Sequence, residues 1–314
     1  MAKSKKSSKK SADKATSEKK TTKSNKTVAE KTAKAEIEVK AEKTEKAEKA
    51  VKKEVITTEK KDGFCKKFFA KKYEENESIL TIFKDKKVYG ALLGEGVGTM
   101  LVALIIMTLG LYQPLYMFFV VLAVVAATYK LSGANLNPIN TAGMMATRRI
   151  SVIRGVLYLL AQVIGAWLGV AIVSAFAKAS GPDVELAGMT AVDESNYWVV
   201  TLVEMLGAMI VGYFFARAQE YKKSALSFAA VVAGGVLIAT VVVYLTLYNY
   251  FGLTGTFMMN PAIALMYKIL PTSADTVGQL LLEIGKALLT YVVLPMVGGV
   301  LGFYISDASK QLAE

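Results

Sequence analysis

The chain has 314 residues, 53% of them hydrophobic, and its apolar residues form uncharged runs that are too long for the core of a water-soluble domain. It has no histidine and a single cysteine, Cys65, which excludes histidine-based triads, histidine-liganded metals and disulfides within the chain. The formal charge of +12 belongs to residues 1–87, because residues 88–314 carry equal numbers of basic and acidic side chains. These features predict a membrane protein, not an enzyme, with no cofactor and no metal site.

Residues 1–62 consist mostly of Lys, Ala, Ser, Thr and Glu, a composition that cannot bury enough apolar surface to order itself. We therefore predict a disordered Lys-rich tail. Its charge leaves anionic lipid open as a partner, while the interspersed Glu residues make nucleic acid a poor candidate. Residues 63–87 place aromatic side chains such as Phe68 and Phe69 among lysines, which predicts a short amphipathic helix at the membrane surface.

The rest of the chain contains six apolar segments near the length of about 20 residues that a bilayer requires. We predict membrane-spanning helices at 88–109, 114–131, 152–176, 197–216, 225–248 and 283–305. Two further apolar segments, 138–147 and 261–270, are too short to cross. Residues 307–314 are expected to form a short C-terminal tail.

Both short segments begin with an Asn-Pro pair, in the sequences Asn137-Pro138-Ile139 and Asn260-Pro261-Ala262. An Asn side chain caps the first turn of a helix, and Pro fits the first helical position because no amide donor is lost there. Non-helical backbone at membrane depth is tolerated only where it is buried in protein or lines a water-filled path. The pattern therefore predicts two half-helices whose preceding loops line such a path.

The chain also contains an internal repeat, in which Glu95-x-x-Gly98 of the first span matches Glu204-x-x-Gly207 of the fourth. Repeat one (88–177) and repeat two (197–306) each read as span, span, half-helix, span. Three spans per repeat is an odd number, so the second copy is predicted to be inverted in the membrane. The half-helices would then enter from opposite faces and meet near the middle.

The distribution of basic residues indicates the orientation of the spans. Clusters at 130–154 and 217–223 fall on the same side as the Lys-rich N-terminus, whereas the connection after the third span is acidic. Because cytoplasmic loops carry an excess of Lys and Arg, we predict a multi-pass cell-membrane protein with both termini in the cytoplasm.

Over residues 88–306 the chain resembles the aquaporin, or major intrinsic protein, family. The specific part of the resemblance is the pair of Asn-Pro motifs, each preceded by a Glu-bearing span, and the Tyr158-x-x-Ala161-Gln162 sequence of the third span supports it. The resemblance implies an all-α bundle of six spans and two half-helices, a homotetramer, and an aquaglyceroporin-like passive channel for water and small uncharged solutes such as glycerol or urea. Asn137 and Asn260 would donate hydrogen bonds to a permeating molecule where the half-helices meet.

Glu95 and Glu204 are the acidic residues deep within the predicted spans, and an intramembrane carboxylate is a functional-site hypothesis by default. The resemblance implies that they hold the half-helices by accepting hydrogen bonds from loop amides, with Gln162 packed inside the bundle. Two alternatives stay open: a proton- or ion-coupled carrier that uses these glutamates, and a poorly conducting membrane scaffold.

The sequence departs from the family pattern at two motif positions. Ile139 replaces the Ala of the first motif, and Ile263 stands where the family usually has the Arg of the outer constriction. Spacing from the Asn residues assigns the other constriction positions to Met117, Tyr248 and Phe257. Loss of the Arg guanidinium, a forked hydrogen-bond donor, predicts either a wider and more apolar filter or a filter that these side chains close.

Overall fold

The computed structural model describes residues 78–109, 114–181, 194–221, 224–253, 257–267, 269 and 275–313, all within one compact unit of the chain, Phe64–Glu314. The predicted tail at 1–62 lies outside the described residues, as does most of the predicted amphipathic segment. The described part of that segment contains α3 (Ile79–Ile82) and the beginning of α4. Every regular element in the described residues is helical, so the predicted all-α class is confirmed.

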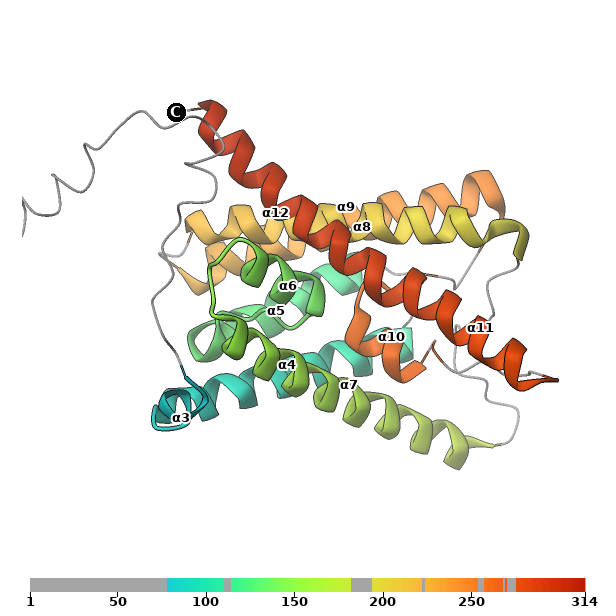
Figure 1. Ribbon diagram of the computed structural model, residues 1–314, viewed down its shortest axis with the longest axis horizontal. Helices are drawn as coiled ribbons and strands as arrows, with labels where there is room; N and C mark the ends of the chain where they lie inside the picture. Colours follow the sequence, from blue (N-terminus) through green and yellow to red (C-terminus); the bar gives the residue numbers. More distant parts are fainter. Residues whose placement is uncertain are drawn as a thin grey trace, which may run out of the picture. The chain divides into compact units, whose positions relative to one another are not determined.

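The described residues contain six helices that are long and apolar enough to cross a membrane, in agreement with the predicted number (Figure 1). Five of them are single helices, namely α4 (Lys86–Leu109), α5 (Pro114–Ser132), α7 (Val152–Ser180), α8 (Tyr197–Ala218) and α9 (Ala225–Phe251). The sixth is a continuous stretch formed by α11 (Val277–Leu288), a π-helical turn η3 (Leu289–Val293) and α12 (Leu294–Ala313). Short 3-10 turns precede and follow α8, at η1 (Glu194–Asn196) and η2 (Gln219–Tyr221).

The sixth span is longer than predicted at both ends. Residues 307–313, which the sequence assigned to a short tail, continue α12 as far as Ala313. Asp307 on this extension pairs with Arg149, which supplies a contact that a free tail would lack.

Local sequence accounts for where several helices begin and end. Ser151 and Thr276 cap α7 and α11, because their hydroxyl oxygens accept hydrogen bonds from Arg154 N (3.1 Å) and Gln279 N (3.2 Å). Helix α9 ends at Phe251 and is capped by Gly252, whose φ of 65° is the left-handed conformation that glycine adopts readily.

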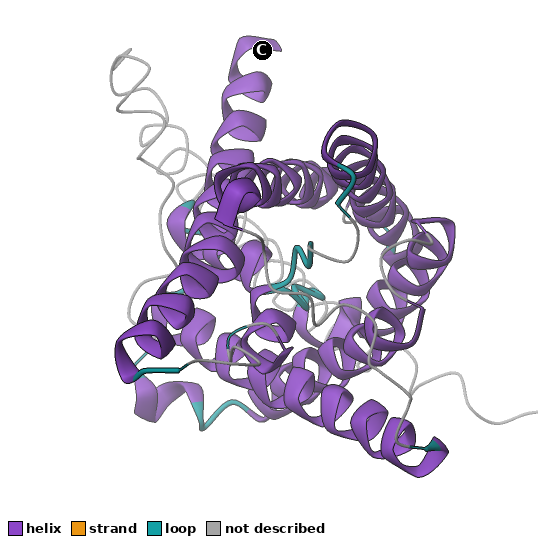
Figure 2. Ribbon diagram, turned by 90° about the vertical axis from the view of Figure 1, so that its right-hand side faces the viewer, coloured by secondary structure: helices purple, strands orange, loops and turns teal. Residues whose placement is uncertain are grey.

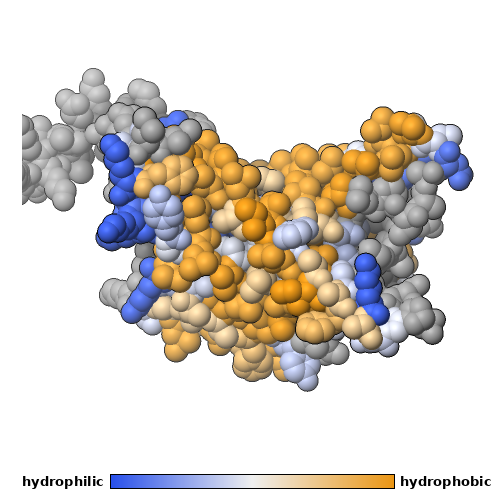
Figure 3. Space-filling model, turned by 90° about the horizontal axis from the view of Figure 1, so that it is seen from below, coloured by the Kyte–Doolittle hydropathy of each residue, from blue (hydrophilic) through white to orange (hydrophobic). Residues whose placement is uncertain are grey.

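The flank of the bundle is apolar between two hydrophilic ends, as Figure 3 shows. Leu93, Trp167 and Leu202 are each more than half exposed on its surface. Such a band on helices that are apolar all round is typical of a surface that lies in lipid or against another copy. We call the end that holds Arg149 and Arg217 the basic face, and the end that holds Ser180 and Tyr197 the opposite face.

Close helix crossings repeat between the two halves. A Cβ placed on Gly165 of α7 would lie 2.0 Å from the carbonyl oxygen of Gly96 on α4, and one placed on Gly298 of α12 would lie 2.2 Å from the carbonyl oxygen of Met205 on α8. Glycine at both positions is required because the backbones approach so closely. Gly96 and Met205 each follow the glutamate of their repeat, so the structure confirms the predicted duplication.

Two half-helices complete the bundle, α6 (Pro138–Ala146) and α10 (Pro261–Tyr267). They begin at the predicted prolines, although α10 is shorter than the predicted 261–270. From its Asn-Pro tip α6 runs towards the basic face, and α10 runs towards the opposite face (Figure 1). Seen from the opposite face, the long helices form a ring around loop backbone (Figure 2).

Candidate functional site

The tips of the two half-helices meet inside the bundle. Nδ2 of Asn137 donates a hydrogen bond to the carbonyl oxygen of Met259 (2.8 Å), and Nδ2 of Asn260 donates to the carbonyl oxygen of Leu136 (3.4 Å). Each amide therefore binds the carbonyl that directly precedes the other asparagine. The approach of the tips that the inverted repeat predicted is present in the structure.

The other amide atom of each asparagine caps its own helix. Oδ1 of Asn137 accepts from Ile139 N (3.0 Å), and Oδ1 of Asn260 accepts from Ala262 N (3.1 Å). Pro138 and Pro261 occupy the first helical position, where no donor is needed. The local rule that motivated the Asn-Pro prediction is followed at both sites.

The residues before the asparagines have a strained backbone. Leu136 and Met259 adopt left-handed conformations with φ of 52° and 47°, which are rare for residues with a side chain. Such a conformation costs about 1–3 kcal/mol and persists only where surrounding contacts hold it. Here each carbonyl accepts a bond from the opposite tip, and that of Leu136 also accepts one from Thr99 Oγ1 (3.2 Å).

Glu95 anchors the loop before α6. The side chain is fully buried, and its two carboxylate oxygens accept hydrogen bonds from Asn135 N (2.9 Å) and Leu136 N (2.7 Å). Gln162 of α7 donates from Nε2 to Glu95 (2.7 Å) and to Thr141 Oγ1 of α6 (2.8 Å). The first half-helix is therefore tied to two spans through its loop and through its own side chain.

Glu204 makes the equivalent contacts in the second repeat. It is also fully buried, and it accepts hydrogen bonds from the backbone N–H groups of Met258 and Met259, the latter at 3.0 Å. Counted from the crossing glycines and the asparagines, Pro295 and Ala264 occupy the positions of Gln162 and Thr141. The side-chain link of the first repeat has no such counterpart at these two positions.

Beside the tips lies a cavity of about 60 Å³, which is space for several water molecules. Valines, an isoleucine and a methionine from α4, α5, α8 and α9 form its apolar wall, and Asn135, Asn137, Asn140, Thr240 and Asn260 provide polar side chains. Residues 134–137 and 258–260, which precede and begin the two half-helices, are all among its lining residues. The cavity therefore has one mainly hydrogen-bonding wall, built by the half-helices and the loops before them, and one mainly apolar wall, in which Thr240 of α9 is polar.

Three residues that line this cavity each have a buried polar atom without a hydrogen-bond partner within the described part of the chain: Asn135 Oδ1, Asn140 Oδ1 and Thr240 Oγ1. A buried group left in this state costs about 1–3 kcal/mol, so these atoms suit a molecule that brings donors into the cavity. No sequence motif marks these three residues as a group. The one available signal was the polar residue three positions after Asn137, where the second repeat has Ile263.

The four predicted constriction residues are not gathered at the cavity. Met117 lines it, whereas Phe257 and Ile263 are buried but are not among its described lining residues. Tyr248 is 50% exposed and stacks on Tyr244, with ring centroids 5.5 Å apart. Its neighbour Leu247 is fully buried. Tyr248 therefore does not line this cavity, and its assignment to the outer constriction stays a prediction.

The bulky Ile139 of the first motif is accommodated by packing. It is fully buried, and its Cγ2 and carbonyl oxygen fill the space in which a Cβ on Gly299 of α12 would lie. Ile139 is not among the described residues that line the cavity. This departure from the family pattern therefore affects helix packing and leaves the described cavity wall unchanged.

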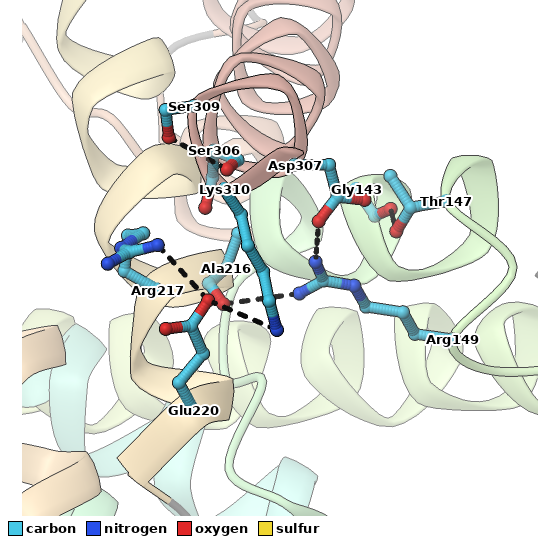
Figure 4. Close-up of polar contacts among 10 residues, drawn as sticks. All are labelled: Gly143, Thr147, Arg149, Ala216, Arg217, Glu220, Ser306, Asp307, Ser309 and Lys310. Atoms are coloured by element: carbon cyan, nitrogen blue, oxygen red, sulfur yellow. Dashed lines mark hydrogen bonds and ion pairs between the residues drawn. The ribbon is translucent and has the colours of Figure 1, made fainter. Parts of the chain in front are cut away.

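The far end of α6 is held at the basic face by Arg149 (Figure 4). Its guanidinium forms an ion pair with Asp307 of α12 (2.5 Å) and donates to the carbonyl oxygen of Ala216 on α8 (3.3 Å). It also lies over the ring of Phe303, 5.1 Å from the centroid. Arg149 thus connects the segment after α6 to two spans of the second repeat.

A family model described as "Major intrinsic protein" matches residues 83–305, more than half of the chain. The chain belongs to the major intrinsic protein family. Members of this family are channels and not enzymes. Both the predicted family and the predicted absence of an enzymatic role are thereby supported.

Curated relatives of this major intrinsic protein include Aquaporin PIP2-7 of Arabidopsis thaliana, 30% identical over 105 residues, and Aquaporin PIP2-7 of Musa acuminata, 34% identical over 103 residues. These matches cover 33% and 32% of the chain, and 38% and 36% of the relatives. The matched region thus spans little more than a third of each relative. The X-ray structure of the aquaglyceroporin from Plasmodium falciparum shares the fold, with a TM-score of 0.56 and 20% identity, covering 70% of this chain and 96% of that one.

Proposed function

We propose that the chain is a passive membrane channel for water and small uncharged solutes. The observation that carries the proposal is the reciprocal pairing of Asn137 and Asn260 with the carbonyls of Met259 and Leu136, beside a cavity that has one hydrogen-bonding wall and one apolar wall. Family membership and the aquaporin names of the relatives support it.

The path would work through exchange of hydrogen bonds. A permeating water or hydroxyl accepts from the asparagine amides and donates to the loop carbonyls, while the valine-rich wall holds it only weakly. The N-terminal ends of α6 and α10 place positive dipole ends at the tips, which disfavours cations. With Ile263 in place of the usual Arg, exclusion of cations rests on these dipoles.

The solute range, assembly and location belong to the same proposal. Ile263 in place of the usual Arg gives a wider and more apolar filter, which favours solutes such as glycerol and urea in addition to water. The exposed apolar flank is suited to lipid and to neighbouring copies in a homotetramer (Figure 3). Arg149 and Arg217 at one end favour placement of that end, with both termini, in the cytoplasm, and of the protein in the cell membrane.

The contacts of the two glutamates favour anchoring over coupled transport. Both oxygens of Glu95 and of Glu204 accept hydrogen bonds from loop backbone amides, so a change of protonation would detach the loops that hold the tips. A passive channel requires only that these two glutamates hold the loops in place. For the same reason we do not favour the carrier alternative.

The test is a permeability panel on the purified chain in vesicles. Water, glycerol, urea and potassium are compared with protein-free vesicles, by light scattering for the neutral solutes and by a potassium-sensitive dye. A channel gives solute flux that is linear in concentration with low activation energy, and little potassium flux. Saturable, pH-coupled uptake would support the carrier, and no flux of any solute would support the scaffold.

A further inference from the structure

The third residue after each tip asparagine differs in character between the two repeats. Asn140 holds this position on α6 and Ile263 holds it on α10. Asn140 lines the cavity, whereas Ile263 is fully buried and is not among the described lining residues. The polar residue therefore lies on the half-helix that runs towards the basic face, one turn beyond the Asn137 tip.

The orientation of the Asn140 amide is fixed by a contact between α6 and the loop that precedes it. Its Nδ2 donates to the backbone carbonyl of Asn135 (2.9 Å), which leaves Oδ1 as an acceptor without a partner in the described structure. Asn135 contributes a second such oxygen from the loop before α6, and Thr240 contributes a hydroxyl from α9. All three side chains are at least 96% buried, since their exposed fractions are 2%, 4% and 0%.

These three atoms define a site that is mostly accepting. The two amide oxygens can only accept hydrogen bonds, and the hydroxyl can accept or donate. The remaining wall near them is apolar, with Val232 and Val236 on the same helix as Thr240. A molecule is well matched to this site if it brings several N–H or O–H donors on one side and needs no donor from the wall.

We propose that Asn135, Asn140 and Thr240 form the solute-selecting site of this pore, and that the site favours small neutral solutes with several N–H or O–H donors. We call these three residues the acceptor site. This inference rests on the proposed channel function and adds where selection occurs. Selection at the acceptor site takes the place of selection at Ile263, because the apolar side chain there can offer no hydrogen bond to a solute.

The acceptor site acts on larger solutes more than on water. When one acceptor is removed, a water molecule can transfer its hydrogen bond to a neighbouring water, because the cavity has space for several. A urea or glycerol molecule that fills the same space displaces those waters and loses the bond outright. Loss of an acceptor should therefore lower the permeability of urea or glycerol relative to water by about two- to tenfold.

The experiment compares two variants with one matched control in vesicles. Thr240→Val removes the hydroxyl and keeps the shape of the side chain, and Asn140→Leu removes the amide. Thr128→Val is the control, because Thr128 is also buried in a span but bonds to its own helix at Val124 O (2.8 Å) and is not among the described lining residues. Urea and glycerol are measured separately, each as a ratio to water in the same preparation.

A lower ratio for urea, glycerol or both in Thr240→Val and Asn140→Leu, with Thr128→Val like the parent, would support the acceptor site. Unchanged ratios in Thr240→Val, or an equal fall in Thr128→Val, would overturn it whether or not Asn140→Leu folds. Parent protein that conducts water but neither urea nor glycerol would overturn the acceptor site and leave the channel proposal intact. Parent protein that conducts nothing would overturn the channel proposal itself.

Discussion

Arg149 and Asp307 are 158 residues apart in the chain and form an ion pair with an N–O distance of 2.5 Å at the basic face. Their side chains are only 13% and 16% exposed, so the pair is poorly screened by solvent. Arg149 directly follows the turn after α6, and Asp307 lies in the part of α12 that extends beyond the predicted span. The pair therefore holds the outer end of one half-helix against a span of the other repeat.

Replacement of Asp307 by Ala should leave the Arg149 guanidinium partly buried without its carboxylate. We expect a loss of about 2 kcal/mol of stability, because hydrogen bonds to charged groups contribute about 1.5–3 kcal/mol. The melting temperature of the protein in detergent measures this. The control is Glu220→Ala, which removes the more exposed ion pairs of Glu220 with Arg217 and Lys310 and should cost under about 1 kcal/mol. Equal effects of the two substitutions would contradict a special role for the Arg149 pair.

The glycine crossings give a sharper prediction. Gly165→Ala places a methyl group 2.0 Å from the carbonyl oxygen of Gly96. Because the atoms it meets belong to the backbone of Gly96 and not to a flexible side chain, α7 must move away from α4. We expect loss of folded protein, measured as the yield of a monodisperse peak in gel filtration. Gly234→Ala serves as the control, because nothing lies within 4 Å of its added Cβ, and it should be neutral or mildly stabilising. A well-folded Gly165→Ala protein would show that the crossing is looser than the structure has it.

Glu204→Gln distinguishes an anchor from a coupling residue. The new amide keeps one acceptor oxygen but turns an N–H₂ group towards one of the two backbone N–H groups of Met258 and Met259. We expect a fall in melting temperature that reflects about 2 kcal/mol, and a matching fall in water permeability per folded protein. If the variant keeps its melting temperature and loses only a pH-dependent uptake, the carrier alternative is favoured.

The architecture was predictable from sequence because each part of it follows a local rule. A span needs about 20 apolar residues, and an Asn-Pro pair both caps and starts a helix, so the six spans and the positions of Pro138 and Pro261 required no knowledge of tertiary packing. The match between Glu95 and Glu204 divides the chain into two repeats of three spans each, and this odd number alone predicted the inversion. The same rules predicted that the tips would meet.

The walls of the cavity were not predictable in this way. Which side of α9 faces the cavity depends on the connection between that helix and Asn260, so the sequence did not indicate that Thr240 lines the cavity. In the sequence, Ile139 in place of Ala suggests a change in the pore lining. In the structure, its bulk occupies the space that a side chain at Gly299, 160 residues away, would need. Such compensations are visible only once helices from both repeats are packed together.

A charge at the tips tests the meeting point directly. Asn137→Asp replaces the amide that donates to Met259 O with a carboxylate, so the positive potential of the converging half-helices is offset by a full negative charge. We expect potassium permeability in vesicles to rise well above that of the parent, while glycerol permeability falls because the donor is lost. Asn260→Asp should act in the same direction, since it places a carboxylate at the other tip, next to Leu136 O. Asn249→Asp is the control, because Asn249 is exposed near the end of α9 and is not among the described lining residues. If potassium flux stays at the parent level in both tip variants while their gel-filtration profiles are normal, ions do not pass between the two asparagines, and the path must lie elsewhere in the bundle.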